Sequence, residues 1–281
     1  MRRSTFCPSF AAGCAASRRS HRRRFSPWLA VVVSAVLCAS AAYAGLVPVK
    51  HREGTAHGFL VLRSEQGSAL ASGELIQTLN GERVTSRLEL HFKDGSVHEE
   101  TTIFSQQSEF RLISDHLRQS GPSFPTPADV FIDATTGEIK VSITKEGETA
   151  HKDYRLPIPD DLANGLVLTL LKNVSPSDAE LTLPMIVASP KPKVVKLTVR
   201  PTGRDQFITS GRSLTTEHYV VRTELGGVAG AIASVLGKRP ADMHYWLVEG
   251  VAPAFVKFEG PLFAEGPIWT IELSDAKPAA E

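Results

Sequence analysis

The chain has few cysteines. The three that it has, Cys7, Cys14 and Cys38, all lie within the first 44 residues. Residues 45–281 therefore contain no disulfide, no thiolate metal ligand and no thiol nucleophile. The chain also lacks the phosphate-binding loop, the dinucleotide-binding glycine pattern, the Gly-x-Ser-x-Gly nucleophile turn and the His-Glu-x-x-His zinc motif. These absences argue against the enzyme classes that such motifs mark, and nothing in the sequence identifies a reaction or a cofactor.

Residues 45–281 do not have an excess of basic residues either. The chain has 31 Lys and Arg against 30 Asp and Glu, but seven of the arginines and none of the acids precede residue 45. Residues 45–281 thus carry 24 basic and 30 acidic side chains, a net charge of −6. Nucleic acid is not an expected partner of such a surface.

The first 44 residues have the pattern of a secretory signal peptide. An apolar run, Trp28–Leu37, precedes Ala42-Tyr43-Ala44, which matches a small-x-small cleavage site. The basic region before the run contains Arg18, Arg19, Arg22, Arg23 and Arg24. Cleavage near Ala44 would start the mature chain at Gly45 and place it in the periplasm or outside the cell. The arginines also resemble a twin-arginine signal, so the export route is left open.

The apolar run is shorter than the ~20 residues that a bilayer requires, so we expect no transmembrane anchor in the mature chain. Cys38 is not expected to carry a lipid, because Leu37 precedes it where a lipoprotein signal needs a small residue.

One stretch after the leader, Asp160–Val174, has the pattern of a buried helix. Its apolar residues cover about half of a helical wheel. Asp160 and Asp161 suit the first turn, where carboxylates meet free amides, and Lys172 suits the last turn. The sequence predicts a helix over residues 160–174 whose central Leu166 and Leu170 face a sheet.

The rest of the chain reads as strands and turns. Asn80-Gly81 and Asp94-Gly95 are dipeptides typical of two-residue hairpin loops, because both loop residues need a positive φ. Alternating apolar and polar residues predict strands near residues 57–63, 69–79, 82–93, 96–106, 109–118, 130–133, 138–144, 148–155, 180–188, 193–200, 206–210, 214–225, 243–249, 254–259 and 268–273. We expect a signal peptide (1–44) and one mainly β domain (45–281), in which a strongly curved antiparallel sheet, a half-barrel or open barrel, packs on the helix.

The candidate metal ligands are His91 and His98. A two-residue Asp94-Gly95 loop places them directly opposite each other, with Glu89 and Glu100 beside them. Two imidazoles and two carboxylates could hold zinc or copper. The alternative, which we favour, is a solvated sheet face with no bound metal.

The candidate ligand-binding residues come from the helix and from a late strand. Residues 243–249 are apolar on both faces, with Tyr245 on one and Trp246 on the other, so this strand is expected to be central or covered by the helix. Leu166, Leu170, Tyr245 and Trp246 would then line an apolar space. Leu225–Gly237, rich in small apolar residues, is expected to be a packed helix or loop, with a mobile lid as the alternative.

The segments GPIWTIEL, HFKDGSVHEETTIFSQ and SDHLRQSGPSFP, together with the leader and the hairpin meander, resemble a group of uncharacterised exported bacterial proteins. Those proteins are similar in outline to the periplasmic lipoprotein carriers, in which a curled antiparallel sheet wraps apolar helices. The resemblance implies an apolar cavity between helix and sheet, and it brings no catalytic residue.

The leading hypothesis is therefore a periplasmic, non-catalytic binding or carrier protein for a lipid or another apolar ligand. An envelope structural or assembly protein, with other envelope proteins as partners, is the alternative. A metal-binding protein or an enzyme is the third.

Overall fold

The structure, a computed structural model, describes residues 43–177, 180–188, 191–209, 212–224, 240–248, 250 and 253–274. These residues belong to one compact unit that runs from Ser40 to Glu281. Residues 1–42, which hold nearly all of the expected signal peptide, and the Leu225–Gly237 segment lie outside the described residues.

The described residues are organised as a single sheet, with a short helix, α2 (Val167–Leu171). The strands are β1 (Tyr43–Ala44), β2 (Ala56–Ser64), β3 (Ala69–Asn80), β4 (Arg83–Phe92), β5 (Val97–Gln106), β6 (Phe110–Ser120), β7 (Ala128–Asp133), β8 (Glu138–Lys145), β9 (Glu148–Arg155), β10 (Leu181–Val187), β11 (Lys193–Thr209), β12 (Arg212–Glu224), β13 (Met243–Val248), β14 (Ala254–Gly260) and β15 (Trp269–Leu273).

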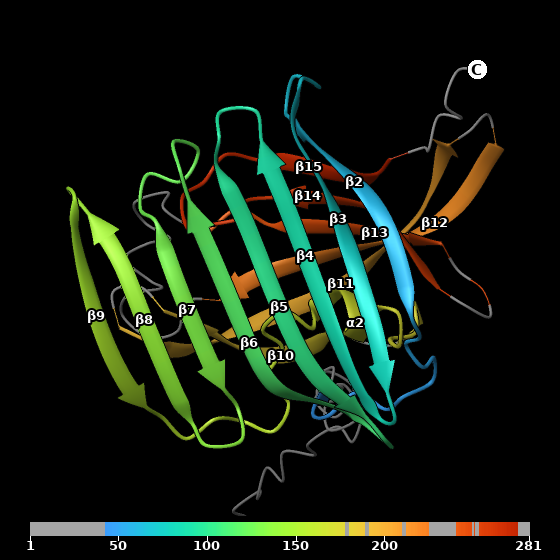
Figure 1. The fold of residues 1–281 in the computed structure, drawn as a ribbon. Coiled ribbons are helices and arrows are strands. Elements are labelled where there is room, and N and C mark those ends of the chain that lie inside the picture. The colour runs from blue at the N-terminus through green and yellow to red at the C-terminus, as the bar shows by residue number, and fades with distance from the viewer. Residues whose placement is uncertain are drawn as a thin grey trace, which may run out of the picture. The chain divides into compact units, whose positions relative to one another are not determined.

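The strand order is β1-β10-β11-β12-β13-β14-β15-β2-β3-β4-β5-β6-β7-β8-β9 (Figure 1). Strands β2 to β15 pair antiparallel with their neighbours, and β1 pairs parallel with β10. The predicted antiparallel, mainly β fold is thus confirmed. The sheet is neither closed nor strongly curled, in contrast to the predicted half-barrel or open barrel. One of its edges is β9, where seven of eight residues are exposed, and a charged edge strand of this kind discourages further pairing.

The hairpin between β4 and β5 differs from the predicted one by one residue. Phe92 N–H donates to Ser96 O (2.9 Å), which closes a loop of three residues, Lys93, Asp94 and Gly95. Gly95 has φ +85°. A three-residue loop that ends in a residue with positive φ is the next most common hairpin after the two-residue form. The slip of one residue moves every β5 side chain to the other face of the sheet.

The predicted helix over residues 160–174 is wrong in its bounds, since only Val167–Leu171 is helical. Gly165 has φ +63°, a left-handed conformation that interrupts a helix at this point. Just before it, Ala163 N–H donates to Pro184 O (2.9 Å), and the Asn164 side chain bonds both the N–H and the C=O of Ile186 (2.7 and 2.9 Å). Residues 163–164 therefore form hydrogen bonds with the backbone along the edge of β10 and do not continue the helix.

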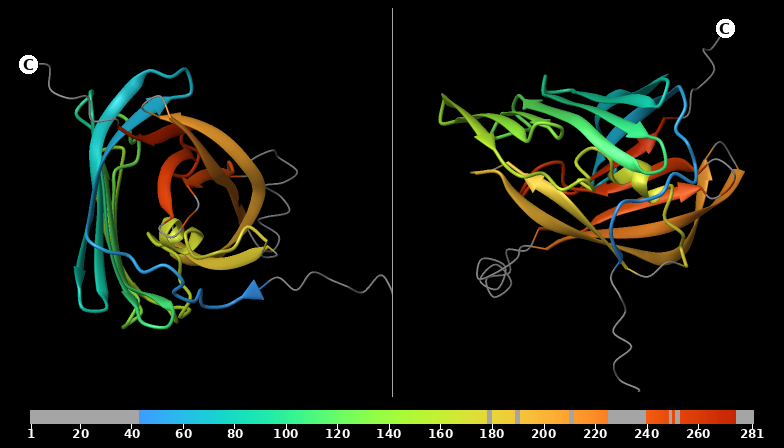
Figure 2. Two further views of the ribbon diagram at one scale, coloured as in Figure 1. Left: turned by 90° about the vertical axis from the view of Figure 1, so that its right-hand side faces the viewer. Right: turned by 90° about the horizontal axis from the view of Figure 1, so that it is seen from below.

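The apolar interior forms two clusters. The larger one combines side chains from β4–β8, from β10–β13 and from Leu162–Leu171. Figure 2 shows α2 between these two groups of strands. The smaller cluster gathers residues of β2–β4, β14 and β15 around Phe124, and Met243 and Tyr245 pack against both clusters.

Candidate functional site

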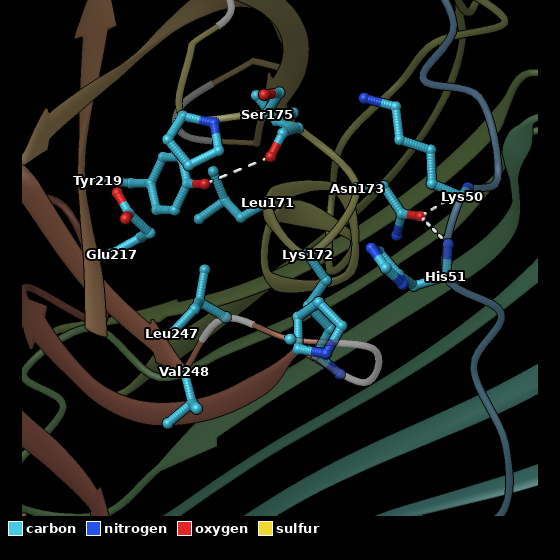
Figure 3. Close-up of a pocket in the computed structure, with 14 residues that line it drawn as sticks. Lys50, His51, Leu171, Lys172, Asn173, Ser175, Glu217, Tyr219, Leu247 and Val248 are labelled. Carbon is cyan, nitrogen blue, oxygen red and sulfur yellow. Dashed lines mark hydrogen bonds between the residues drawn. The ribbon is translucent and has the colours of Figure 1, made fainter. Parts of the chain in front are cut away.

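A pocket of about 490 Å³ lies beside the C-terminal end of α2 (Figure 3). Four segments meet there: the stretch between β1 and β2, α2 with the residues that follow it, β12, and β13 with the start of its connection to β14. The lining residues are Lys50, His51, Leu171, Lys172, Asn173, Val174, Ser175, Pro176, Glu217, Tyr219, Leu247, Val248, Gly250 and Pro253.

Asn173 fixes one wall of the pocket. This side chain is buried, and its Oδ1 accepts hydrogen bonds from the backbone N–H groups of Lys50 (2.9 Å) and His51 (2.7 Å). Its Nδ2 donates to Thr169 O (2.9 Å), within the last turn of α2. The amide thereby ties an extended stretch without secondary structure to the helix.

The same stretch is held at Glu53 by two further contacts. Gln106 accepts from Glu53 N–H (2.7 Å) and donates to Glu53 O (2.8 Å). The Lys172 ammonium lies 2.9 and 3.1 Å from the two carboxylate oxygens of Glu53, and both side chains are nearly buried (13% and 9% exposed). Removing one member of such a pair leaves an uncompensated charge, which typically costs about 3 to 5 kcal/mol. This wall of the pocket is therefore held in place by contacts that also stabilise the fold.

The opposite wall is mostly apolar, with one charged exception. Leu171, Tyr219 and Leu247 are buried core residues that also border the pocket. Glu217 is buried beside them, and its carboxylate accepts from the Arg204 guanidinium of β11. The Tyr219 hydroxyl donates to Val174 O (3.3 Å; Figure 3). The pocket thus offers an apolar surface on one side and polar groups around Lys50, His51 and Asn173 on the other.

Leu166 and Leu170 do not reach this pocket. Their exposed fractions are 1% and 3%, and the gap beside them, next to Val47, Phe110 and Leu183, is too small to admit a water molecule. Leu171 borders the pocket in their place. The two leucines are packed into the larger cluster.

Tyr245 and Trp246 lie on opposite faces of β13, as the alternation of a strand requires. Tyr245 points inward, with its ring centroid 5.0 Å from that of Phe258. Trp246 lies on the outer face, where it stacks on His218 (4.3 Å) and its Nε1 donates to Asp205 Oδ2 (2.7 Å). The structure therefore does not bring Trp246 together with Leu166 and Leu170.

His91 and His98 are also separated. His91 pairs with Val97 in the register, and its Nε2 lies 2.7 Å from Glu89 Oε1 on the outer face. His98 is buried on the inner face. Among the described residues, no group of three or more His, Cys, Asp or Glu side chains is arranged to hold a metal ion.

Added zinc should therefore leave the melting temperature nearly unchanged, because a ligand raises stability by RT ln(1 + [L]/Kd) only if it binds the folded state. Thermal unfolding with and without zinc chloride tests this in the wild type and in His91→Ala. A large zinc-dependent rise that His91→Ala abolishes would restore the metal hypothesis.

Sequence reasoning missed Lys50 and His51 because it predicts no strand, helix or site before residue 57 in the mature chain. One signal was present in β12. Glu217 shares the face of Tyr219 and Val221, which are both buried, so an acid stands where the alternation calls for an apolar residue. A charge at such a position marks a partnered or functional site.

Comparison of the chain with protein-family models, with curated proteins and with solved structures finds no match. None of the helices formed by the described residues has the length and apolar character needed to cross a membrane.

Proposed function

We propose that the protein is an exported, non-catalytic binding or carrier protein for a lipid or another small, largely apolar molecule, which it holds in the pocket beside α2. The pocket itself is the observation that carries this proposal. Its volume, about 490 Å³, falls within the ~300 to 1,000 Å³ typical of small-molecule sites. The ligand-binding residues are then Leu171, Val174, Tyr219 and Leu247, in place of Leu166 and Leu170.

The lining suggests how the ligand would lie. Its apolar part would cover Leu171, Tyr219 and Leu247, and its polar end would face Lys50 and His51 (Figure 3). The two buried charges at the pocket, Lys172 and Glu217, each have an ion partner in Glu53 and Arg204. Each charge is thereby neutralised by its partner, so an apolar part of a ligand can lie beside it without leaving an unpaired buried charge. The similarity to the periplasmic lipoprotein carriers remains part of this proposal.

Val174→Arg should weaken binding of a fluorescent fatty acid at least tenfold, because Val174 lines the pocket and a guanidinium in its apolar wall competes with the ligand and opposes its burial. Fluorescence titration of the purified protein measures the affinity, and native mass spectrometry shows whether lipid co-purifies. The matched control is Val194→Arg on β11, where the side chain is already 44% exposed.

Equal affinity in Val174→Arg and Val194→Arg would remove the pocket from the proposal. A wild-type protein that neither binds the fatty acid nor carries lipid, but captures envelope proteins, would favour the assembly role.

A further inference from the structure

A row of polar side chains crosses the interior between the two apolar clusters. On β5 the inward positions are His98, Glu100 and Thr102, followed by the buried Phe104. On β6, Asp115 pairs with Thr102 and Gln119 pairs with His98. Ile103 pairs with Ser114 and Phe104 pairs with Leu112, so β6 has one extra residue at this point. This β-bulge puts Asp115 on the same side of the sheet as Leu112. The inner face of the sheet, which is largely apolar, is therefore acidic at this point.

In the described part of the chain, no Lys or Arg side chain forms an ion pair with Glu100 or Asp115. Gln119 Nε2 donates to His98 Nδ1 (3.0 Å) and to Leu262 O (2.8 Å), so Nδ1 is an acceptor and the ring proton lies on Nε2. Burial lowers the pKa of His98 to about 4, which keeps the imidazole neutral. Its Nε2 has no hydrogen-bond partner in the described part of the chain.

The negative charge of Asp115 acts on Glu100 and disfavours its ionisation. Asp115 Oδ1 accepts from Thr102 Oγ1 (2.9 Å), and neither Glu100 nor Asp115 has an ion partner within 4 Å among the described Lys and Arg side chains. Burial, and for Glu100 also the Asp115 charge, raises the pKa of Glu100 to about 8 and that of Asp115 to about 6. His116 opposes the rise for Asp115.

The opposing half of the sheet contributes Tyr245, whose pKa is raised by burial and by Glu100. Among the described residues, His116 acts on Asp115 and Tyr245 interacts with Glu100, and neither is a buried cation that could hold two carboxylates in place.

The turn before α2 lies against one of the two acids, Asp115, and against Thr102. A Cβ added to Gly165 would sit 1.9 Å from Thr102 Oγ1 and 2.6 Å from Asp115 Oδ1, so the bare backbone is in contact with both side chains. Ionised carboxylates require water. The backbone of Gly165 occupies the space next to Asp115 that such water needs.

We propose that Glu100 and Asp115 form a proton-dependent latch: the protonated pair holds the Gly165 turn and α2 against β5 and β6, and ionisation of the pair releases them. The protons pass to solvent. The latch does not depend on what the pocket binds.

Hydrogen exchange followed by mass spectrometry tests the latch. After correction for the intrinsic pH dependence of exchange, a peptide covering residues 160–171 should exchange at least tenfold faster at pH 9 than at pH 6. A peptide from β11, residues 193–209, should change little. Glu100→Gln should remove most of the pH effect, because glutamine stays neutral and only Asp115 still ionises, whereas Glu99→Gln on the outer face should keep the full effect.

Equal protection at both pH values, or an undiminished effect in Glu100→Gln, would overturn the latch. Equal acceleration in both peptides would do the same, since it means global destabilisation. If Glu100→Gln fails to fold, Asp115→Asn replaces it, because its side-chain oxygen still accepts from Thr102. Failure of both neutral variants to fold would contradict the proposal that the neutral pair is the closed form.

Discussion

Replacing Leu166 by alanine should lower the free energy of unfolding by about 2 to 5 kcal/mol, the usual range for a leucine removed from a packed core. Leu166 is 1% exposed, and the gap beside it admits no water. Because the surrounding side chains come from both groups of strands and from α2, they cannot all move to fill the space. Denaturant unfolding of the wild type and the variant measures the difference.

Leu79→Ala is the matched control, since the same atoms are removed from a side chain that is 42% exposed on β3. We expect it to cost no more than about 0.5 kcal/mol. Fatty-acid affinity should be unchanged in Leu166→Ala, because the pocket is lined by Leu171 and not by Leu166. A small loss of stability combined with altered lipid binding would show that Leu166 lines a ligand space after all.

The turn dipeptides predicted the hairpins but not their register. Asp94-Gly95 correctly marks a reversal of the chain, yet the same dipeptide fits a two-residue loop and a three-residue loop that ends in a positive φ. Both forms satisfy local sterics, so the choice depends on which β5 face the sheet can bury. The structure buries His98, Thr102 and Phe104, a face that looked wet in the sequence.

The helix shows how tertiary contacts override a local pattern. The apolar spacing of residues 162–171 correctly identified buried side chains, because burial of Leu162, Leu166 and Leu170 does not require a regular helix. The Asn164-Gly165 dipeptide indicates a turn, and the helix prediction did not take it into account. The Asn164 side-chain amide bonds to the backbone of β10, and Gly165 has a positive φ, which residues with a β-carbon disfavour.

The candidate pocket could not be predicted in the same way. Its walls come from segments more than a hundred residues apart, such as Lys50 with Asn173, and no local period connects them. The pairing order of the strands and the contacts of Lys172 and Asn173 with residues 50–53 bring them together. The strands themselves have strong local signals, which is why the sheet was predictable and the site was not.

Glu100→Gln should stabilise the protein at pH 8, on the order of 2 to 4 kcal/mol. The ordinary pKa of a glutamate, 4.5, describes the unfolded chain, and burial with Asp115 raises the pKa in the folded protein to about 8. Below pH 4.5 both states hold the proton, so the wild type is not penalised. As the pH rises towards 8, the unfolded chain releases the proton while the folded one keeps it, and stability falls by up to about 1.4 kcal/mol per pH unit.

Glutamine has no proton to lose, so the variant should lack most of this decline. We expect less than the full linkage value, because the Glu100 side chain keeps some contact with solvent. Asp115, whose pKa is also raised, should still produce a smaller decline of the same sign between about pH 4 and 6. Urea unfolding at pH 5, 6.5 and 8 measures the difference between variant and wild type at each pH.

Glu99→Gln separates the buried charge from a general loss of acidity. Glu99 is the next residue along β5 and lies on the outer face, where it pairs with Arg87 (3.1 Å) and Arg118 (3.6 Å). Exposed pairs contribute about 0 to 1 kcal/mol, so this variant should be slightly less stable and should keep the wild-type pH slope. Parallel stability curves for the wild type and Glu100→Gln from pH 5 to 8 would mean that Glu100 ionises freely in the folded protein. The interior between the two clusters would then be hydrated at neutral pH, and the Gly165 turn would need another reason to lie against β5 and β6.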